Sequence, residues 1–352
     1  MAIISISQLK IGDKIIEDVI TKTGNVLFKK GLHVTPREHE ILRAFLIPSV
    51  SIEQKENDPD NQEKTEEFKA EDSGLIQFYT EYDKMLQLLK KVYRNAMSSP
   101  TLPILDIRVG LEQLIGKIEH YNILTFSPRM MDTGEYIYHN SIMVALTSYQ
   151  LARWHGFTSK DWMPIAIGGL LHDIGNAKVD PAILSKPSKL TKNEVEEVRR
   201  HTLYGYSIMK NIPALNDGTK LCALQHHERE DGSGYPLAVK GDKIHPYAKI
   251  VATADIFHAM TSHRAYKKAE SPYLVLEQLQ QESFGKLDPT IVTTFINKVT
   301  QFHNGTIVKL SDNRVGQIIF TDRANPTRPM VNLNGTIVNL ATERSLFIQE
   351  VI

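Results

Sequence analysis

The chain has 352 residues, and its 41 lysine and arginine residues balance its 41 aspartate and glutamate residues. This length allows two or three domains, and the balanced charge excludes a polycationic surface for polymeric nucleic acid or for an anionic membrane. The only cysteine, Cys222, excludes an intrachain disulfide, and no apolar run approaches the roughly 20 residues that span a bilayer. The start of the chain has no signal-peptide pattern, so we expect a soluble, cytoplasmic protein.

Residues 1–52 predict a small α+β module. Short segments of alternating apolar and polar residues, separated by glycine, indicate strands, and Thr35, Pro36 and Glu38 give the pattern of a capping box at a helix start. Residues 53–73 are charged and polar and lack large aliphatic side chains. Such a stretch buries too little apolar surface to offset the cost of ordering, so we expect a flexible acidic linker.

Residues 74–300 show helical periodicity throughout and predict an all-helical domain. One of its helices begins with a second capping box, formed by Thr191 and Glu194. Residues 301–352 return to alternation with turn signals typical of hairpins, and they predict a small β unit. The expected fold class is therefore mainly α, with an α+β module before the helical domain and a β unit after it.

Histidines and carboxylates of the helical region carry the chemical signal. Glu135 and His139 are four residues apart, so they share one face of a helix, although most such pairs are solvated surface pairs. His172 and Asp173 end an apolar helix. Because a buried ionised aspartate is costly unless it is paired or binds a cation, these two residues suggest ligands rather than packing.

Four further residues extend this pattern. Asp255 is a carboxylate within an otherwise apolar helix and needs a partner for the same reason. His201 lies on the helix that Thr191 begins, and for it alone a core histidine bonded to a carbonyl is the competing interpretation. His226 and His227 end another helix, and because adjacent helical residues diverge by about 100°, they can serve different metals or bridge the space between them.

This ligand set contains imidazole and carboxylate and no thiolate, which suits iron, manganese or zinc. It exceeds the usual four ligands, so it predicts two or three ions. Two ions about 3.5–4 Å apart can hold a bridging hydroxide and steady both oxygens of an in-line phosphoryl displacement.

The sequence at these positions resembles the HD-GYP branch of the HD-domain metal-dependent phosphohydrolases. The likeness rests on "HD" at 172, on His201 and on "HHEREDGSGYP" at 226–236, and it extends from about Gly134 to Phe295. It implies a bacterial phosphodiesterase that hydrolyses cyclic di-GMP to linear pGpG, and in some members to GMP. It also implies an all-helical domain with two or three divalent metal ions, commonly iron or manganese, with zinc, nickel and magnesium as alternatives.

The resemblance assigns roles to single residues. It makes His172 and Asp173 the catalytic pair, with Asp173 bridging two metals, and it uses Glu135 and His139 to complete a third metal site. The full set of implied metal ligands is Glu135, His139, His172, Asp173, His201, His226, His227 and Asp255. The implied substrate-binding residues are Gly234, Tyr235, Pro236, Arg264 and Lys267, with Arg264 and Lys267 contacting phosphate and the Tyr235 ring able to stack on guanine.

The residues of the loop after the paired histidines predict a tight turn. We expect Arg229 to order the turn through Glu228 or Asp231. Gly232 and Gly234 then permit a tight backbone path that other residues resist.

Two positions depart from the family pattern, and they keep alternatives open. Asn176 replaces a usual lysine, and His258 replaces an aspartate that many members carry. Three functions therefore stay open. The protein is an active phosphodiesterase, a catalytically weak or inactive cyclic di-GMP receptor, or a hydrolase of another nucleotide. For the N-terminal and C-terminal modules, sensing, homodimer contacts and contacts with a signalling protein remain open.

Overall fold

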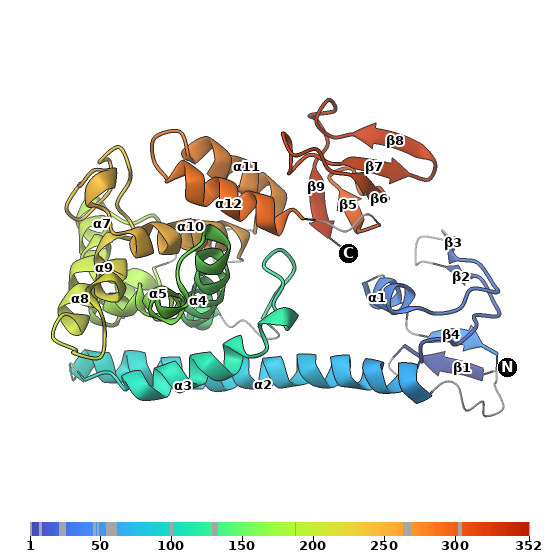
Figure 1. Cartoon of the computed structure of the whole chain (residues 1–352), viewed down its shortest axis with the longest axis horizontal. Coiled ribbons are helices and arrows are strands. Elements are labelled where there is room, and N and C mark those ends of the chain that lie inside the picture. The colour runs from blue at the N-terminus through green and yellow to red at the C-terminus, as the bar shows by residue number, and fades with distance from the viewer. Residues whose placement is uncertain are drawn as a thin grey trace. The chain divides into compact units, whose positions relative to one another are not determined.

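The structure is a computed structural model, shown in Figure 1. It describes a defined set of residues, namely 2–6, 9–20, 26–44, 47, 49–53, 62–98, 101–128, 133–186, 188–262, 269–301 and 305–351. The chain divides into two compact units, Met1–Gly74 and Leu75–Val351. No helix in the described ranges is both long enough and apolar enough to cross a membrane.

The first unit is the small α+β module that the sequence predicts. Its elements are β1 (Ala2–Ser5), β2 (Val19–Ile20), β3 (Val26–Phe28), α1 (Pro36–Ala44) and β4 (Ser49–Ile52). Strand β1 pairs antiparallel with β4, and β2 pairs antiparallel with β3. One half of the capping box expected before α1 is present, because the Thr35 backbone N–H donates to Glu38 Oε2 at 3.0 Å. The Thr35 hydroxyl donates to the same carboxylate oxygen. Ile15 and Leu42 are fully buried at the centre of the module.

Helix α2 (Gln62–Ser98) begins within the segment expected to be a flexible linker. Residues 62–73 are therefore helical, contrary to that expectation. The physical reason is that glutamate, lysine and glutamine are good helix formers even where they bury little surface. Polar composition alone does not separate such a helix from a coil.

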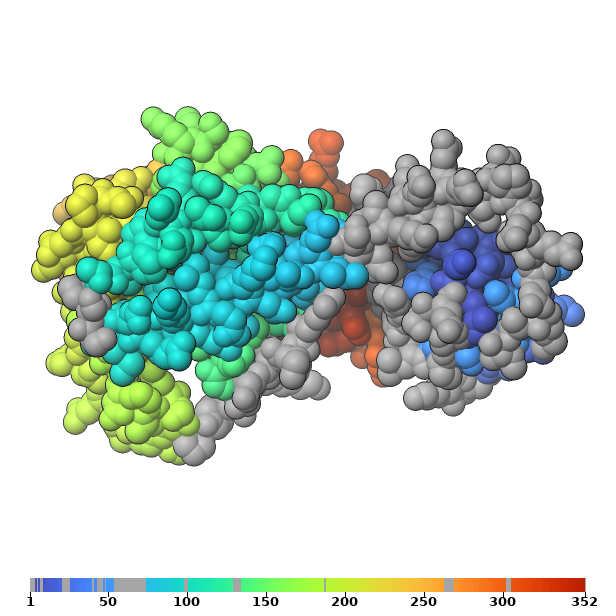
Figure 2. Space-filling model, turned by 90° about the horizontal axis from the view of Figure 1, so that it is seen from below, coloured from blue at the N-terminus to red at the C-terminus, as the bar shows by residue number. Residues whose placement is uncertain are grey.

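The second unit is helical from its start, as the periodicity predicts. Its α-helices after α2 are α3 (Ile104–Ile115), α4 (Tyr136–His155), α5 (Ser159–Leu171), α6 (Pro181–Leu184), α7 (Lys192–Arg199), α8 (His201–Met209), α9 (Asp217–Gln225), α10 (Pro246–Thr261), α11 (Pro272–Glu282) and α12 (Pro289–Val299). Short 3-10 turns lie at η2 (Ile118–His120), η3 (Thr133–Glu135), η4 (Ile174–Lys178) and η5 (Gly241–Lys243). Helices α4, α5 and α10 pack together in the interior, while α2 and α3 lie along one face (Figures 1 and 2).

The helix expected to begin at Thr191 is divided in two. Thr191 and Glu194 form the predicted capping box at the start of α7. The helix then breaks at Arg200, and His201 is the first residue of α8. The sequence shows no glycine or proline at this break, so periodicity runs through it unnoticed.

The chain ends in a five-stranded antiparallel sheet of order β8-β7-β6-β5-β9, which confirms the predicted small β unit. Its strands are β5 (Ile307–Leu310), β6 (Val315–Phe320), β7 (Met330–Leu333), β8 (Thr336–Asn339) and β9 (Ile348–Val351). The hairpin turns contain Asn313 and Asn334 at φ values of 69° and 52°, a conformation that asparagine tolerates. The sheet packs on α11, where Tyr273 joins its core and the Ser271 hydroxyl donates to the Ile348 carbonyl at 2.5 Å.

Candidate metal centre

The ends of several helices bring the centre together. Asp173 follows α5 and leads into η4, which packs on α8. Gly175 makes this close approach possible, because a Cβ at that position would lie 1.9 Å from the His201 carbonyl oxygen and 2.4 Å from the Gly205 nitrogen. Gly175 therefore has a packing role, which places Asp173 next to His201.

The Asp173 carboxylate lies between two groups of ligand atoms. Its Oδ1 is 3.2 Å from His201 Nε2 and 3.7 Å from His226 Nε2. Its Oδ2 is 3.4 Å from His172 Nε2, and that nitrogen is also 3.4 Å from Asp255 Oδ1. Asp173, His201, His226 and His227 can place ligand atoms within 4.8 Å of one another, so they form a candidate metal-binding group.

Backbone carbonyls fix the tautomers of three of these histidines. The Nδ1 atoms of His172, His201 and His226 lie 2.7, 2.6 and 2.9 Å from the carbonyl oxygens of Gly169, Val198 and Cys222. Because a carbonyl only accepts, each Nδ1 carries a hydrogen, so each ring in its neutral form directs the Nε2 lone pair toward the centre. His201 is thus bonded to a backbone carbonyl, as a core histidine would be, but its other ring nitrogen faces Asp173.

Unpaired lone pairs at the centre fit a metal cation. The Nε2 atoms of His201 and His226 are 3.2 Å apart, and two neutral imidazoles in this tautomer have no hydrogen to share between them. His172 Nε2 is buried too and lies 3.4 Å from a carboxylate oxygen of Asp173 and of Asp255. Such an arrangement is stable when a cation accepts the lone pairs, and the imidazole and carboxylate donors suit a divalent ion.

The pKa values of the histidines at the centre also fit the binding of a cation. Burial by itself lowers the pKa of His172, but the carboxylates of Asp173 and Asp255 outweigh it and hold that pKa well above its usual range. The attraction of these carboxylates for a proton is equally an attraction for a metal ion. Burial lowers the pKa of His227 to about 3, and burial together with the neighbouring histidines holds the pKa of His226 well below its usual range. Both rings are therefore neutral, as metal binding requires.

Tyr235 forms a wall beside His227. The two rings stack with centroids 4.7 Å apart, and the Arg199 guanidinium lies 4.9 Å from the Tyr235 ring centroid. The sequence interpretation offered Tyr235 as a platform for guanine, which stays a prediction. The structure adds a second role, the support of His227, and it adds Arg199, which sequence reasoning missed because no local pattern links it to residue 235.

Glu228 holds the loop that carries Tyr235. Its buried carboxylate accepts hydrogen bonds from the backbone N–H groups of Leu237 at 2.7 Å and Val239 at 3.1 Å. Arg229 orders the turn differently from the expectation, because it donates to the backbone carbonyls of His226 and Glu228 rather than to an acidic side chain.

Two glycines allow the backbone of this loop to turn tightly, as the sequence predicts. Gly232 has a φ of 82°, in the left-handed region. A Cβ on Gly234 would lie 2.4 Å from the Glu228 Cα, so only glycine fits there. The peptide bond between Tyr235 and Pro236 is cis.

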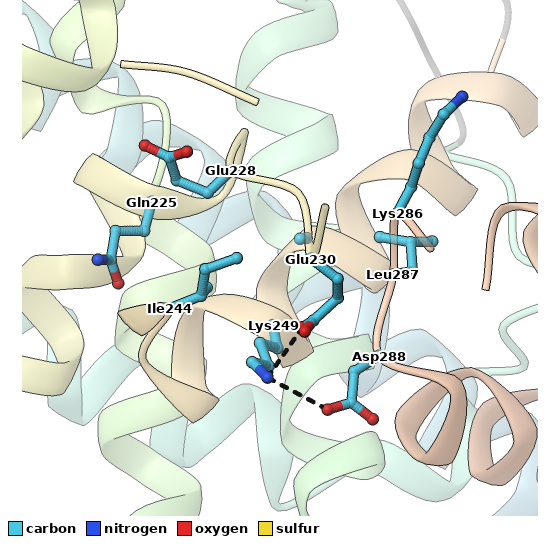
Figure 3. A pocket seen from close by; sticks show the side chains of 9 residues that line it. Gln225, Glu228, Glu230, Ile244, Lys249, Lys286, Leu287 and Asp288 are labelled. Carbon is cyan, nitrogen blue, oxygen red and sulfur yellow. Dashed lines mark hydrogen bonds and ion pairs between the residues drawn. The ribbon is translucent and has the colours of Figure 1, made fainter. Parts of the chain in front are cut away.

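A small pocket lies behind the same loop (Figure 3). Lys249 of α10 reaches across it to Glu230 Oε1 at 2.8 Å and to Asp288 Oδ2 at 3.4 Å, as the dashed lines in Figure 3 show. This ion triad ties the loop to α10, the helix that carries Asp255, and to the residue that caps α12.

Glu135 and His139 lie next to this centre as a separate pair. Glu135 Oε2 is 3.8 Å from His139 Nε2, so the predicted shared face is confirmed. The neighbouring Asn140 donates to Asp255 Oδ1 at 3.1 Å, which connects the start of α4 to the centre. Lys90 of α2 forms an ion pair with Glu135 at 2.5 Å, and sequence reasoning missed it because it lies 45 positions upstream.

The two departures from the family pattern are structurally distinct. The Asn176 side chain donates to the Asp173 backbone carbonyl at 3.2 Å, so it braces the ligand-bearing turn and supplies no cation. His258 is buried, with Nε2 2.7 Å from Thr147 Oγ1 and 3.3 Å from the Tyr121 hydroxyl. Its Nε2 is therefore engaged in this hydrogen-bond network. Arg264 and Lys267 lie outside the described residues.

Part of this chain is similar to known proteins. Residues 125–291 match the family model described as HD domain. The Pseudomonas aeruginosa protein named "Cyclic di-GMP phosphodiesterase PA4108" is 32% identical over 202 residues, which cover 57% of this chain and 49% of that protein. The Xanthomonas campestris "Cyclic di-GMP phosphodiesterase response regulator RpfG" is 30% identical over 232 residues, covering 65% of this chain and 58% of the relative. The Vibrio cholerae "3'3'-cGAMP-specific phosphodiesterase 2" is 27% identical over 241 residues, with 67% and 45% covered.

Among solved structures, the Bdellovibrio bacteriovorus protein Bd1817, described as an HDG"Y"P protein, matches with a TM-score of 0.48 and 14% identity over 84% of this chain and 97% of that chain. The chain spans about half the length of the curated relatives it matches.

Proposed function

We propose, since residues 125–291 of this chain match the HD domain family, that the protein is a metal-dependent phosphodiesterase that hydrolyses cyclic di-GMP to linear pGpG. One observation carries the proposal. The Asp173 carboxylate has His201 and His226 on one oxygen and His172 on the other, so one carboxylate serves two groups of cation ligands. Relatives named cyclic di-GMP phosphodiesterases support the substrate.

The residues of this chain would hold two divalent ions, with Asp173 shared between them. His201, His226 and His227 lie on one side of that carboxylate, and His172 and Asp255 lie on the other. The imidazole and carboxylate donors suit iron, manganese or zinc, and the resemblance to the HD-GYP family favours iron or manganese. When bound, such ions lower the pKa of a water molecule and neutralise charge on the phosphoryl oxygens.

The protein's own contribution is the fixed orientation of these donors. Carbonyl-bonded Nδ1 atoms hold the imidazoles of His172, His201 and His226 in one tautomer. Tyr235 packs against His227 and shields it on one side. From the sequence we assign the substrate phosphates to Arg264 and Lys267, and we assign Gly234 and Pro236 to shaping the loop that meets the nucleotide.

A receptor that binds cyclic di-GMP without hydrolysing it is the second candidate. The observation that favours it is Asn176, whose amide bonds the Asp173 carbonyl at the position where the family resemblance implies a lysine. A cyclic GMP-AMP substrate is the other alternative, since several relatives are named for that nucleotide.

Turnover by the full chain tests the proposal. Protein purified without oxygen and loaded with Mn²⁺ or Fe²⁺ is incubated with cyclic di-GMP, 3'3'-cyclic GMP-AMP or cyclic di-AMP, and the products are identified by mass spectrometry. We expect linear pGpG from the wild type, and loss of product by 100-fold or more in Asp173→Ala and His172→Ala, with His120→Gln as an unaffected control outside the centre. Binding of cyclic di-GMP without any linear product would favour the receptor.

A further inference from the structure

A second set of cation ligands lies at the start of α4. The buried His139 ring has its Nδ1 2.9 Å from the Tyr82 hydroxyl, and the two rings stack with centroids 5.8 Å apart. Its Nε2 is buried with no hydrogen-bond partner and lies 3.8 Å from Glu135 Oε2. A fixed imidazole with an unpartnered nitrogen beside a carboxylate is a ligand pair for a cation.

The carboxylate of this pair already binds a side-chain cation, the ammonium of Lys90. Lys90 Nζ is 2.5 Å from Glu135 Oε1, and both side chains are partly buried, with 20% and 31% of their surfaces exposed. Lys90 projects from α2, whose buried neighbours Leu89 and Val92 fix the helix against the core. The ammonium is therefore held in place by the packing of α2.

We propose that Lys90 takes the place of a third metal ion at Glu135 and His139, so that the loaded chain holds two metal ions rather than three. This inference rests on the two-ion centre of the proposed function. A divalent ion at Glu135 would share its carboxylate with an ammonium only a few ångströms away, and the repulsion between two such positive charges opposes binding of the ion. Removal of the ammonium leaves a carboxylate and a free imidazole nitrogen, which are ordinary ligands for the same ions.

Metal counting tests this directly and does not depend on activity. The full chain is loaded with Mn²⁺ under anaerobic conditions, freed of loosely bound metal, and analysed for manganese per chain by mass spectrometry. We expect two ions in the wild type and three in Lys90→Met. Lys90→Arg keeps the positive charge and should hold two, and Lys91→Met, an exposed neighbour on the same helix, should also hold two.

The outcomes separate the inference from the function beneath it. Three ions in the wild type, or two in Lys90→Met, would overturn the role of Lys90 while leaving the phosphodiesterase intact. Fewer than two ions in the wild type would overturn the shared-carboxylate centre and this inference with it. Should Lys90→Met fail to fold, Lys90→Gln gives the same comparison with an uncharged polar side chain.

Discussion

The Nε2 atoms of His201 and His226 face each other at 3.2 Å, while the Nδ1 of each ring is bonded to a backbone carbonyl. Both lone pairs thus point at the same space beside Asp173. The stability of the folded chain should therefore depend on a cation that accepts them.

Metal binding should raise thermal stability through this centre. A ligand that binds only the folded state at 100 times its dissociation constant adds about 2.7 kcal/mol to the free energy of unfolding. We expect Mn²⁺ to raise the melting temperature of the wild type by several degrees in calorimetry, and a chelator to reverse the rise. Asp173→Asn should lose the effect and His120→Gln should keep it, so an equal rise in Asp173→Asn would place the metal elsewhere.

Gly175→Ala should damage both the fold and the centre. The new Cβ would lie 1.9 Å from the His201 carbonyl oxygen, and backbone atoms cannot move aside as a flexible side chain can. Overpacking of this kind costs about 3 kcal/mol, which urea denaturation measures. Gly134→Ala is the matched control, because its Cβ meets no atom within 4 Å, and it should change the free energy of unfolding by less than about 0.5 kcal/mol. A Gly175→Ala protein as stable as the control would contradict the packing of η4 on α8.

The loop that carries Tyr235 should loosen in Glu228→Gln. The carboxylate accepts two backbone hydrogen bonds while it is buried, whereas an amide offers one oxygen and turns its NH₂ toward the other backbone donor. We expect a loss of about 2 kcal/mol, since hydrogen bonds to charged groups are worth about 1.5–3 kcal/mol. Amide exchange measured by mass spectrometry should speed up at Leu237 and Val239. In Asp242→Asn, an exposed change nearby, exchange at these amides should stay as slow as in the wild type.

His258 should make the fold sensitive to acid. Burial lowers its pKa from about 6.5 to about 3, so above pH 6.5 the ring is neutral in both the folded and the unfolded chain and has no effect on stability. Below pH 6.5 only the unfolded chain takes up the proton, and the folded state loses up to about 1.4 kcal/mol per pH unit until the pKa near 3 is reached. The His258→Gln variant removes this contribution, so the gap in unfolding free energy between the two proteins should shift in favour of the variant from pH 7 to pH 5. A gap that stays constant would show that His258 titrates normally.

The sequence predicts the helices and strands well, but it does not predict which residues from distant segments come into contact at the site. The capping signals at Thr35 and Thr191 both mark real helix starts, because this signal is local. The full capping box forms at Thr191, and one of its two bonds forms at Thr35. The HD domain expected from "HD" at 172 and the paired histidines agrees with the family match over residues 125–291. The α+β module, the helical domain and the terminal β unit follow from periodicity, which is also a local property.

The rest depends on contacts between distant segments. Periodicity continues through Arg200, so it does not show the break that makes His201 the first residue of α8. Lys90 and Arg199 reach the site from other helices, and nothing in their own neighbourhoods indicates Glu135 or Tyr235 as a partner. His258 shows the same limit, because its hydrogen bond to Thr147 joins residues 111 positions apart.

The central claim is that Asp173 is shared between two metal ions. Anomalous X-ray scattering at the manganese edge, from crystals of Mn²⁺-loaded protein, tests it most directly. We predict two peaks on opposite sides of the Asp173 carboxylate, one bordered by His201, His226 and His227 and the other by His172 and Asp255. A single peak that Asp173 does not touch, or loaded crystals with no peak among these side chains, would contradict it.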